Sequence, residues 1–119
     1  MVRKDLNMRK GKMIAQGAHA SMAFLTTALR KCTVVWDELN LTMEEQEWVL
    51  GPFTKIVCYV NSEAELEEVA KKAEAAGLTV HRIVDNGLTE FKEPTYTCVG
   101  IGPHDESKFV GITDSLPLL

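Results

Sequence analysis

The 119-residue sequence contains no long hydrophobic run. None of its apolar stretches approaches the roughly 20 residues that a transmembrane helix needs, and its first ten residues, MVRKDLNMRK, lack the apolar core of a secretory signal peptide. We therefore expect a cytoplasmic protein without a membrane anchor. Hydrophobic residues at 45% and charged residues at 25% are typical of a globular chain, which predicts a single domain over residues 1–119 and argues against disorder.

Cysteine is also scarce, and its spacing excludes the usual cysteine sites. Cys32, Cys58 and Cys98 are odd in number and widely separated, with no CxxC pair. Two of them sit in apolar runs, KIVCYV and YTCVGI, a pattern typical of buried, reduced thiols. His81 and His104 have no ligand partner at a suitable spacing. We expect neither a disulfide framework nor a metal site.

Three common motifs are missing as well. The chain has no GxSxG elbow, no P-loop and no GxGxxG loop. It therefore lacks the signatures of a serine nucleophile and of mononucleotide binding.

The net charge of −4 is distributed unevenly along the chain. Residues 1–12 hold five basic residues against one acidic residue, a local charge of +4, whereas residues 37–68 hold nine acidic residues against one basic residue, a local charge of −8. Because salt confines each patch to about 8–10 Å, the basic end could still meet a phosphate backbone. The alternative is that both segments are only solvated surfaces.

Apolar periodicity predicts helices and strands in alternation, and hence an α/β layer sandwich with a partly parallel sheet. The predicted elements are a strand stub at residues 1–3, helices at 13–31, 42–50 and from Ser62 to Gly77, strands at 53–60, 79–85 and 95–103, and a helical turn or two within 104–112. The strand at 53–60 is expected to be well buried. The last leucines, Leu116, Leu118 and Leu119, are expected to dock on the body.

Two helices carry apolar stripes that should face the core. In the first helix the stripe is Ile14, Ala18, Met22, Leu25 and Leu29, and in the helix after Ser62 it is Leu66, Val69, Ala70 and Ala73. Gly17 in the first helix costs helix stability, which indicates either a close approach by another segment or plain tolerance.

The stretch GKMIAQGAHASM places Lys12, Gln16 and His19 at positions i, i+4 and i+7, on one polar face of the first helix. A cation at the positive end of the helix dipole is unfavourable unless an anion compensates it. A carboxylate such as Asp85 or a ligand phosphate would do so. His19 could be a general base, a phosphate contact or only a hydrogen-bonded helix residue.

Asp85 ends an apolar strand and opens the loop DNGLTEF. Functional residues of open α/β sheets gather at the carboxyl ends of strands, although Asp85 could instead cap its own loop in an Asx-turn. Thr89, Glu90, Thr95 and Thr97 follow within a dozen positions. Their hydroxyls could orient a water or bind a phosphate oxygen, or the threonines could simply favour strand structure.

Several of these segments together resemble one known family. VRKDLNMRKGKMIAQGAHASM, TKIVCYV, SEAELEEVAKKAEAAGL, VDNGLTEF, PTYTCVGIGP and ITDSLPLL occur in an order and spacing similar to the peptidyl-tRNA hydrolase 2 family, in its bacterial-type form. The resemblance implies a three-layer α/β/α sandwich around a mixed sheet of about four strands. The first strand is expected to be short, because this chain has almost nothing where many members have a full apolar first strand. It also implies hydrolysis of the ester between a peptide and the 3′-terminal ribose of tRNA.

The resemblance further implies roles for individual residues. Lys12 and Asp85 would form the catalytic pair, and His19, Thr89 and Thr97 would support it. Binding of peptidyl-tRNA would involve Arg3, Arg9, Lys10, Gln16 and Thr95. No cofactor or membrane partner is implied, and a homodimer is consistent with the resemblance and with an incomplete edge strand.

The chain departs from the family pattern near the expected site. Many members have arginine where Leu88 stands and glutamine where Glu90 stands. Both changes make the site less positive, which would weaken RNA binding.

The resulting hypothesis is an esterase that uses neither a metal nor a covalent nucleophile. Asp85 would polarise a water or the ribose hydroxyl, and Lys12 would stabilise the oxyanion. The alternatives are a non-catalytic tRNA- or anion-binding module on the same scaffold, and a regulatory domain that binds a small anion at Lys12.

Overall fold

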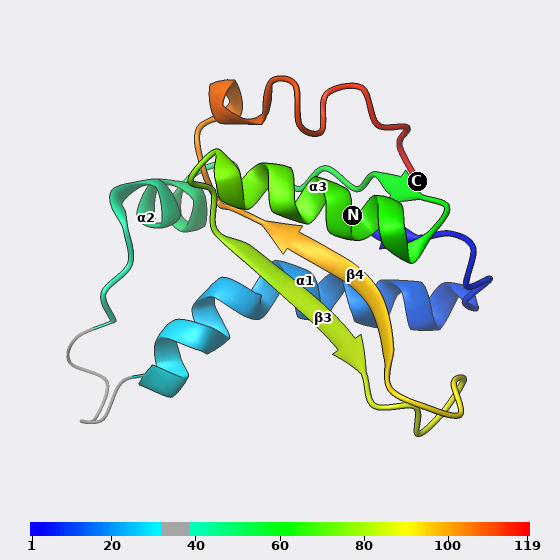
Figure 1. Cartoon of the computed structure of the whole chain (residues 1–119). Coiled ribbons are helices and arrows are strands. Elements are labelled where there is room, and N and C mark those ends of the chain that lie inside the picture. Colours follow the sequence, from blue (N-terminus) through cyan, green and yellow to red (C-terminus); the bar gives the residue numbers. More distant parts are fainter. Residues whose placement is uncertain (32–38) are drawn as a thin grey trace.

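Figure 1 shows the computed structural model, which describes residues 1–31 and 39–119. In chain order the elements are β1 Val2–Arg3, α1 Lys10–Lys31, α2 Met43–Leu50, β2 Tyr59–Val60, α3 Glu63–Ala75, β3 Val80–Asp85, β4 Thr95–Ile101 and a short 3₁₀ helix, η1, Glu106–Phe109. The expectations for Cys32, Asp37 and Glu38 concern residues outside the described ranges. Among the helices of the described ranges, none is both long and apolar enough to span a bilayer.

The four strands form one mixed sheet in the order β2-β1-β4-β3. β1 is parallel to β2 and antiparallel to β4, and β4 is antiparallel to β3. Helix α3 lies in front of the sheet in Figure 1 and α1 lies behind it. The expected three-layer α/β/α sandwich with a short first strand is confirmed.

Each face of the sheet has its own hydrophobic core, as a layered fold requires. On the α3 face the buried residues are Val60, Leu66, Ala70 and Val99. On the α1 face they are Val2, Met8 and Cys98, with Met13, Ala20, Ile83 and Phe91 packed against them. Cys58 and Cys98 are buried free thiols, as predicted.

The short strand β1 lies inside the sheet, which corrects the expectation of an incomplete edge strand. Val2 donates its amide to the Cys58 carbonyl at 3.0 Å on one side, and Met1 accepts from Val99 at 2.9 Å on the other. The outer edge at β2 is covered by the C-terminal segment, since Tyr59 donates to the Pro117 carbonyl at 3.0 Å.

The docking predicted for the last leucines holds only in part. Leu116 packs against the α3-side core. Leu118 and Leu119 keep 70% and 49% of their surface exposed. Their segment is held by its backbone instead, through a bridge between Cys58 and Leu118 and a 2.9 Å bond from the Leu119 amide to the Val57 carbonyl.

Helices α2 and α3 begin and end where their local signals predict. Thr42 and Glu45 form a reciprocal capping box before α2. Ser62 caps α3 by accepting from the Glu65 amide, and the predicted stripe of α3 is buried (Leu66, Val69, Ala70 and Ala73). Gly77 follows with φ of +78°, the left-handed conformation that glycine adopts most easily after a helix.

The predicted core stripe of α1 is wrong. Ile14, Met22 and Leu29 are 73%, 43% and 36% exposed, whereas the buried residues of the helix are Gln16, Ala23 and Phe24. Ala18 is exposed as well, and Leu25 only partly buried. The helix has small or apolar residues on more than one face, so periodicity did not determine which face meets the sheet. The helix also begins at Lys10, three residues earlier than expected.

The predicted strand at 53–60 is largely wrong. Only Tyr59 and Val60 pair in the sheet, and Ile56 is 71% exposed. Phe53 stacks on Trp48 of α2 with ring centroids 4.2 Å apart, and the indole nitrogen donates to the Thr54 carbonyl at 2.7 Å. These contacts hold the start of the segment against α2, so its β-forming residues do not become a buried strand.

The closest approach of α1 to the sheet occurs at Gly100 of β4. A Cβ on Gly100 would lie 2.6 Å from the Ala20 carbonyl oxygen of α1. A Cβ on Gly17 would have no atom of another segment within 4 Å. Gly17 is therefore tolerated rather than required, and Gly100 is the glycine that packing demands.

Candidate active site

Lys12 and Asp85 form an ion pair across 73 positions of sequence. Lys12 lies in the first turn of α1, and Asp85 is the last residue of β3. Their side chains are only 12% and 13% exposed. The helix thus presents its ammonium to the carboxyl end of a strand, and the carboxylate supplies the anion that a cation at a helix N-terminus needs.

Asp85 is held by three donors. Its Oδ2 accepts from Lys12 Nζ and, at 3.0 Å, from Gln16 Nε2. Its Oδ1 accepts from the Gly87 amide at 3.0 Å, which is the Asx-turn considered as an alternative. Asp85 therefore both caps its loop and meets Lys12. The hydrogen bond from Lys12, followed by those from Gly87 and Gln16, lowers the pKa of this carboxyl, so it is ionised at neutral pH.

A β-bulge brings Thr97 to the same cluster. Ile83 pairs with Cys98 and Val84 pairs with Tyr96, so Thr97 is an extra residue on β4. It is fully buried, and its hydroxyl lies 2.5 Å from Gln16 Oε1. Because the Cys98 thiol also contacts the Gln16 backbone at 3.3 Å, two successive residues of β4 face α1. The bulge thereby lets Thr97 and Cys98 hold Gln16 in place.

The loop at residues 86–94 also contacts the Lys12–Asp85 pair. Lys12 Nζ donates to the Thr89 hydroxyl at 3.0 Å, and it lies 5.6 Å from the centre of the Phe91 ring. Gly87 has φ of +78°, and a Cβ there would be 2.6 Å from the Glu93 backbone. Only glycine therefore fits the turn that aims the Gly87 amide at Asp85.

Arg9 and Glu90 close the loop onto the start of α1. Glu90 accepts from Arg9 Nε at 2.7 Å and from the Arg9 backbone amide at 3.2 Å. These two bonds lower the pKa of Glu90. The Arg9 side chain remains 80% exposed, while that of Glu90 is 16% exposed.

A comparison with protein families shows which family this chain belongs to. Residues 1–119 match the family described as Peptidyl-tRNA hydrolase PTH2. The chain belongs to this family. It is therefore a peptidyl-tRNA hydrolase, an enzyme that hydrolyses esters.

Curated relatives support the membership over nearly their full lengths. Peptidyl-tRNA hydrolases of Thermoplasma acidophilum, Saccharolobus solfataricus and Methanocaldococcus jannaschii are 38%, 39% and 40% identical to this hydrolase over 99%, 100% and 100% of its chain. The matches cover 93%, 95% and 96% of those proteins. All three relatives are archaeal, which corrects the expectation of a bacterial-type form.

The structure brings some of the hydrolase's predicted site residues together and leaves others apart. Lys12, Gln16, Asp85, Thr89 and Thr97 form one connected cluster. Thr95 pairs with Asp85 across the strands, but its hydroxyl bonds to the Glu93 carbonyl at 2.9 Å.

The remaining predicted residues lie outside the cluster. His19 and Lys10 are exposed on α1, and within the described ranges no hydrogen bond or ion pair joins His19 to the Lys12–Asp85 cluster. Arg3 is 11% exposed, and it bonds to Asp5 and to Glu63 at 2.7 and 2.6 Å. Arg3 is thus occupied by structural partners.

Sequence reasoning missed two contributors to this site, Gly87 and Phe91. The Gly87 amide could have been found from the D-x-G spacing of an Asx-turn, whereas nothing local marks Phe91 as a neighbour of Lys12. In residues 1–31 and 39–119, no group of three His, Cys, Asp or Glu side chains is placed to hold a metal ion.

Proposed function

We propose that Lys12 and Asp85 carry out the hydrolysis of the ester between the peptidyl group and the 3′-terminal ribose of tRNA. The observation that supports this most directly is their nearly buried ion pair, whose carboxylate is held by three donors. Such a preorganised pair can act on developing charge without rearranging.

Asp85 orients and polarises the attacking water. Because its pKa is lowered, it is a weak base that suits hydrogen bonding better than full proton removal. The bond that forms joins the water oxygen to the ester carbonyl carbon, and the bond that breaks joins that carbon to the ribose oxygen. The proton that the water loses ends on the leaving ribose oxygen.

Lys12 stabilises the oxyanion that develops on the carbonyl oxygen. A lysine ammonium has three hydrogen-bond donors, and Asp85 and Thr89 take two of them. The third donor is left for the oxyanion. Thr89 and Asp85 fix the ammonium so that this donor has a defined direction, which is the geometric requirement of electrostatic stabilisation.

The other predicted residues bind the substrate or position Asp85. Arg9 and Lys10, both exposed beside the pair, would contact the tRNA backbone. Gln16 and Thr97 position Asp85, because both are buried and cannot reach solvent or substrate. For Arg3, His19 and Thr95 a contact with more distant parts of the substrate remains the proposal.

Single substitutions test the catalytic assignment. Lys12→Ala and Asp85→Ala should each reduce the release of N-acetylated amino acid from tRNA by more than about 100-fold. Lys71→Ala is the matched control, because Lys71 is an exposed lysine of α3 on the opposite face of the sheet. Wild-type turnover in either site variant would refute the assignment, and circular dichroism would verify that each variant is folded.

Binding measured in parallel separates hydrolysis from the non-catalytic alternative. A wild-type protein that retains peptidyl-tRNA without releasing peptide would be a binding module. We expect turnover.

We also propose that the protein works in the cytoplasm, where its substrate is formed, and as a homodimer. Ile14, Met22 and Leu29 expose apolar surface along one side of α1 that a second copy would cover. Sedimentation equilibrium of the wild type and of Ile14→Glu tests this pairing, with a monomeric wild type as the contrary result.

A further inference from the structure

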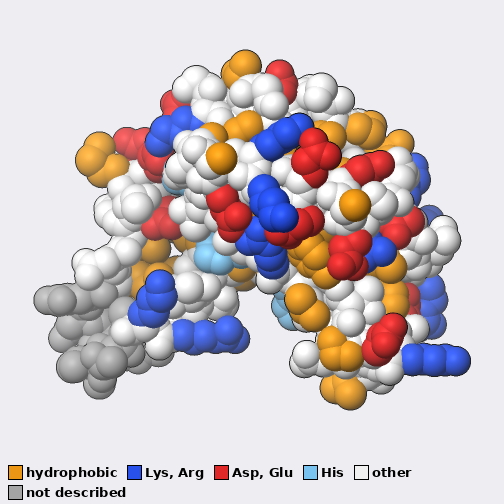
Figure 2. Space-filling view, in the orientation of Figure 1, with side chains coloured by type: hydrophobic (Ala, Val, Ile, Leu, Met, Phe, Trp, Pro, Cys, Tyr) orange, Lys and Arg blue, Asp and Glu red, His pale blue; other side chains and the backbone are white. Residues whose placement is uncertain are grey.

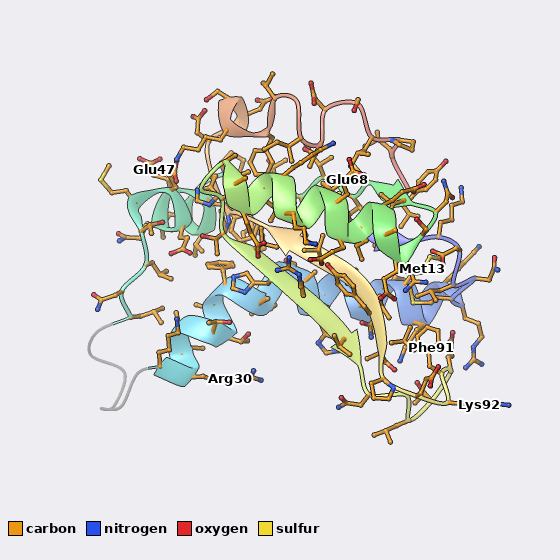
Figure 3. All side chains as sticks on the ribbon, in the orientation of Figure 1. Met13, Arg30, Glu47, Glu68, Phe91 and Lys92 are labelled. Atoms are coloured by element: carbon orange, nitrogen blue, oxygen red, sulfur yellow. The ribbon has the colours of Figure 1, made fainter. Side chains whose placement is uncertain are left out.

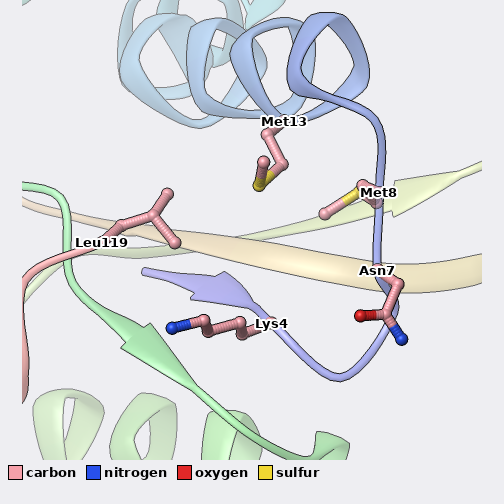
Figure 4. Close-up of a pocket in the computed structure, with 5 residues that line it drawn as sticks. All are labelled: Lys4, Asn7, Met8, Met13 and Leu119. Carbon is pink, nitrogen blue, oxygen red and sulfur yellow. The ribbon is translucent and has the colours of Figure 1, made fainter.

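A hollow of about 270 Å³ opens on the α1 face of the sheet. Its walls are Met13 of α1, Met8 and Asn7 of the segment after β1, Lys4, and Leu119 (Figure 4). Helix α1 packs mainly on β4 and β3. The hollow therefore lies where the helix leaves the β1 and β2 side of the sheet uncovered.

One apolar cluster contacts residues of both the hollow and the catalytic site. Met13 and Phe91 both pack against the buried cluster that contains Met8, and Figure 3 shows the labelled Met13 and Phe91 at the same end of α1. The Phe91 ring is in turn 5.6 Å from Lys12 Nζ. A peptide that extends from an ester at Lys12 along this cluster would pass Phe91 before it reaches Met8 and Met13.

The walls favour an aliphatic occupant of variable shape. Methionine side chains are flexible and polarizable, so two of them can adapt to different apolar groups. The substrates of the proposed reaction carry peptides of many sequences, which requires such adaptability. An aromatic ring that could stack on a nucleobase is absent from the residues lining the hollow in the described part of the chain.

The polar groups at the rim of the hollow also affect which ligand side chains it can bind. Lys4 Nζ lies 3.9 Å from the centre of the Tyr59 ring, which keeps a positive charge at one side of the hollow. This charge disfavours a lysine or arginine side chain of a ligand. Asn7 offers an amide that can pair with a peptide group.

We propose that this hollow binds an uncharged aliphatic side chain of the peptidyl group, one of the residues close to the ester. The inference rests on the proposed function, because it assigns the hollow to the same substrate. It makes the enzyme prefer peptides with an apolar residue at one position while it accepts the others at a lower rate.

The test uses four tRNA esters of one peptide length. One carries N-acetyl-tetraglycine, and each of the other three has a single leucine at the first, second or third residue from the ester. We expect one leucine position to raise kcat/KM by about 5- to 10-fold, because burying part of a leucine side chain stabilises binding. A lysine at that position should give no gain.

Leu119→Ala should reduce the leucine gain to less than about twofold while the tetraglycine ester reacts as in the wild type. Leu118→Ala is the matched control, because Leu118 is 70% exposed and does not line the hollow. Met13→Ala provides a second test from the opposite wall.

Equal rates for all four wild-type esters would overturn the inference, and so would a leucine gain that survives in both Leu119→Ala and Met13→Ala. Neither result would affect the proposed function, which is tested separately by Lys12→Ala and Asp85→Ala and which would also fail if none of the four esters were hydrolysed.

Discussion

At the scale of single residues, the site depends on hydrogen bonds that are buried and complete. Asp85 has three donors, and Gln16 connects it to the fully buried Thr97. A buried polar group that loses its partner costs more than the bond contributed. We therefore expect stability and activity to respond together to changes in this cluster.

Two neighbouring hydroxyls of β4 provide a matched comparison. The Tyr96 hydroxyl is buried without a hydrogen-bond partner among the described residues, and burial raises the pKa of Tyr96 to about 12. Tyr96→Phe should therefore leave the free energy of unfolding unchanged or raise it by up to about 1 kcal/mol. Thr97→Val should lower it by about 1–3 kcal/mol, because Gln16 loses its partner. Urea unfolding measures both changes. Equal effects would contradict the conclusion that the Thr97 hydroxyl is hydrogen-bonded and the Tyr96 hydroxyl is not.

The lowered pKa of Asp85 predicts a direction for the effect of pH. A carboxyl whose pKa is lower in the folded state contributes stability above its unfolded pKa of about 3.9, and that contribution is lost as the pH falls through the folded value. Activity should follow the same carboxylate and decline only below about pH 3.9.

Gln16→Met removes one of the three donors and should move the acid limb of kcat/KM to higher pH. Profiles of the wild type and Gln16→Met provide the measurement. Coincident limbs would show that Gln16 does not act through Asp85.

At the scale of elements, α1 is the part that joins the fold to the chemistry. Its first turn supplies Lys12, its second supplies Gln16, and its middle meets β4 at Gly100. The distance between α1 and β4 therefore affects both packing and the geometry of the site.

Two glycine substitutions test this contact. Gly100→Ala places a Cβ 2.6 Å from the Ala20 carbonyl oxygen and should lower the free energy of unfolding by about 1–3 kcal/mol, with a loss of kcat. Gly17→Ala meets no atom within 4 Å and should raise helix stability by about 0.5–1 kcal/mol. Thermal unfolding compares the two variants. A higher melting temperature for Gly100→Ala would refute the close approach of α1 to β4.

The loop between β3 and β4 is the second such element, and Glu90 ties it to Arg9. A tRNA phosphate would have to compete with Glu90 for this guanidinium. Glu90→Gln should therefore lower KM for peptidyl-tRNA about threefold or more by removing a negative charge beside the site, with little change in kcat. An unchanged or higher KM would show that the Arg9–Glu90 pair serves to shape the loop rather than to limit tRNA binding.

At the scale of the whole molecule, basic and acidic residues are concentrated in different segments, although the net charge is only −4. The molecule measures 40 × 34 × 25 Å, so opposite ends lie beyond the screening length of about 8 Å at physiological salt. Figure 2 shows basic and acidic side chains close together on one face. One such group of opposite charges joins β3 to α3, where Arg82 pairs with Glu67 and Glu74 at 2.9 and 2.5 Å. The pair with Glu67 neutralises one charge of the acidic segment at residues 37–68, which reduces the repulsion of RNA by that segment.

Salt should therefore act on substrate binding and not on the chemical step. KM for peptidyl-tRNA should rise steeply between about 50 and 200 mM salt, because counterions compete for the phosphate contacts, while kcat stays nearly constant. An ester of adenosine alone serves as the control and should show a flat response. A flat response with tRNA itself would favour recognition of a small anion over recognition of RNA.

The sequence by itself determined several of the elements and the kinds of residue at the site. The capping box of Thr42, the cap at Ser62, the stripe of α3 and the strand that ends at Asp85 all follow from local rules about backbone donors and apolar periodicity. A cation at a helix N-terminus needs a compensating anion, which left Asp85 or a ligand phosphate open as the partner of Lys12. The resemblance to the family indicated Asp85.

Only the tertiary structure decided which face of α1 is buried, that residues 53–57 stay outside the sheet, and that β1 lies in its interior. It also decided that an extra residue in β4 turns Thr97 toward Gln16. These features depend on contacts between segments distant in sequence. Local propensity is nearly equal for the alternatives. The packing of α1 on the sheet and the contacts of Trp48 with Phe53 and Thr54 select among them.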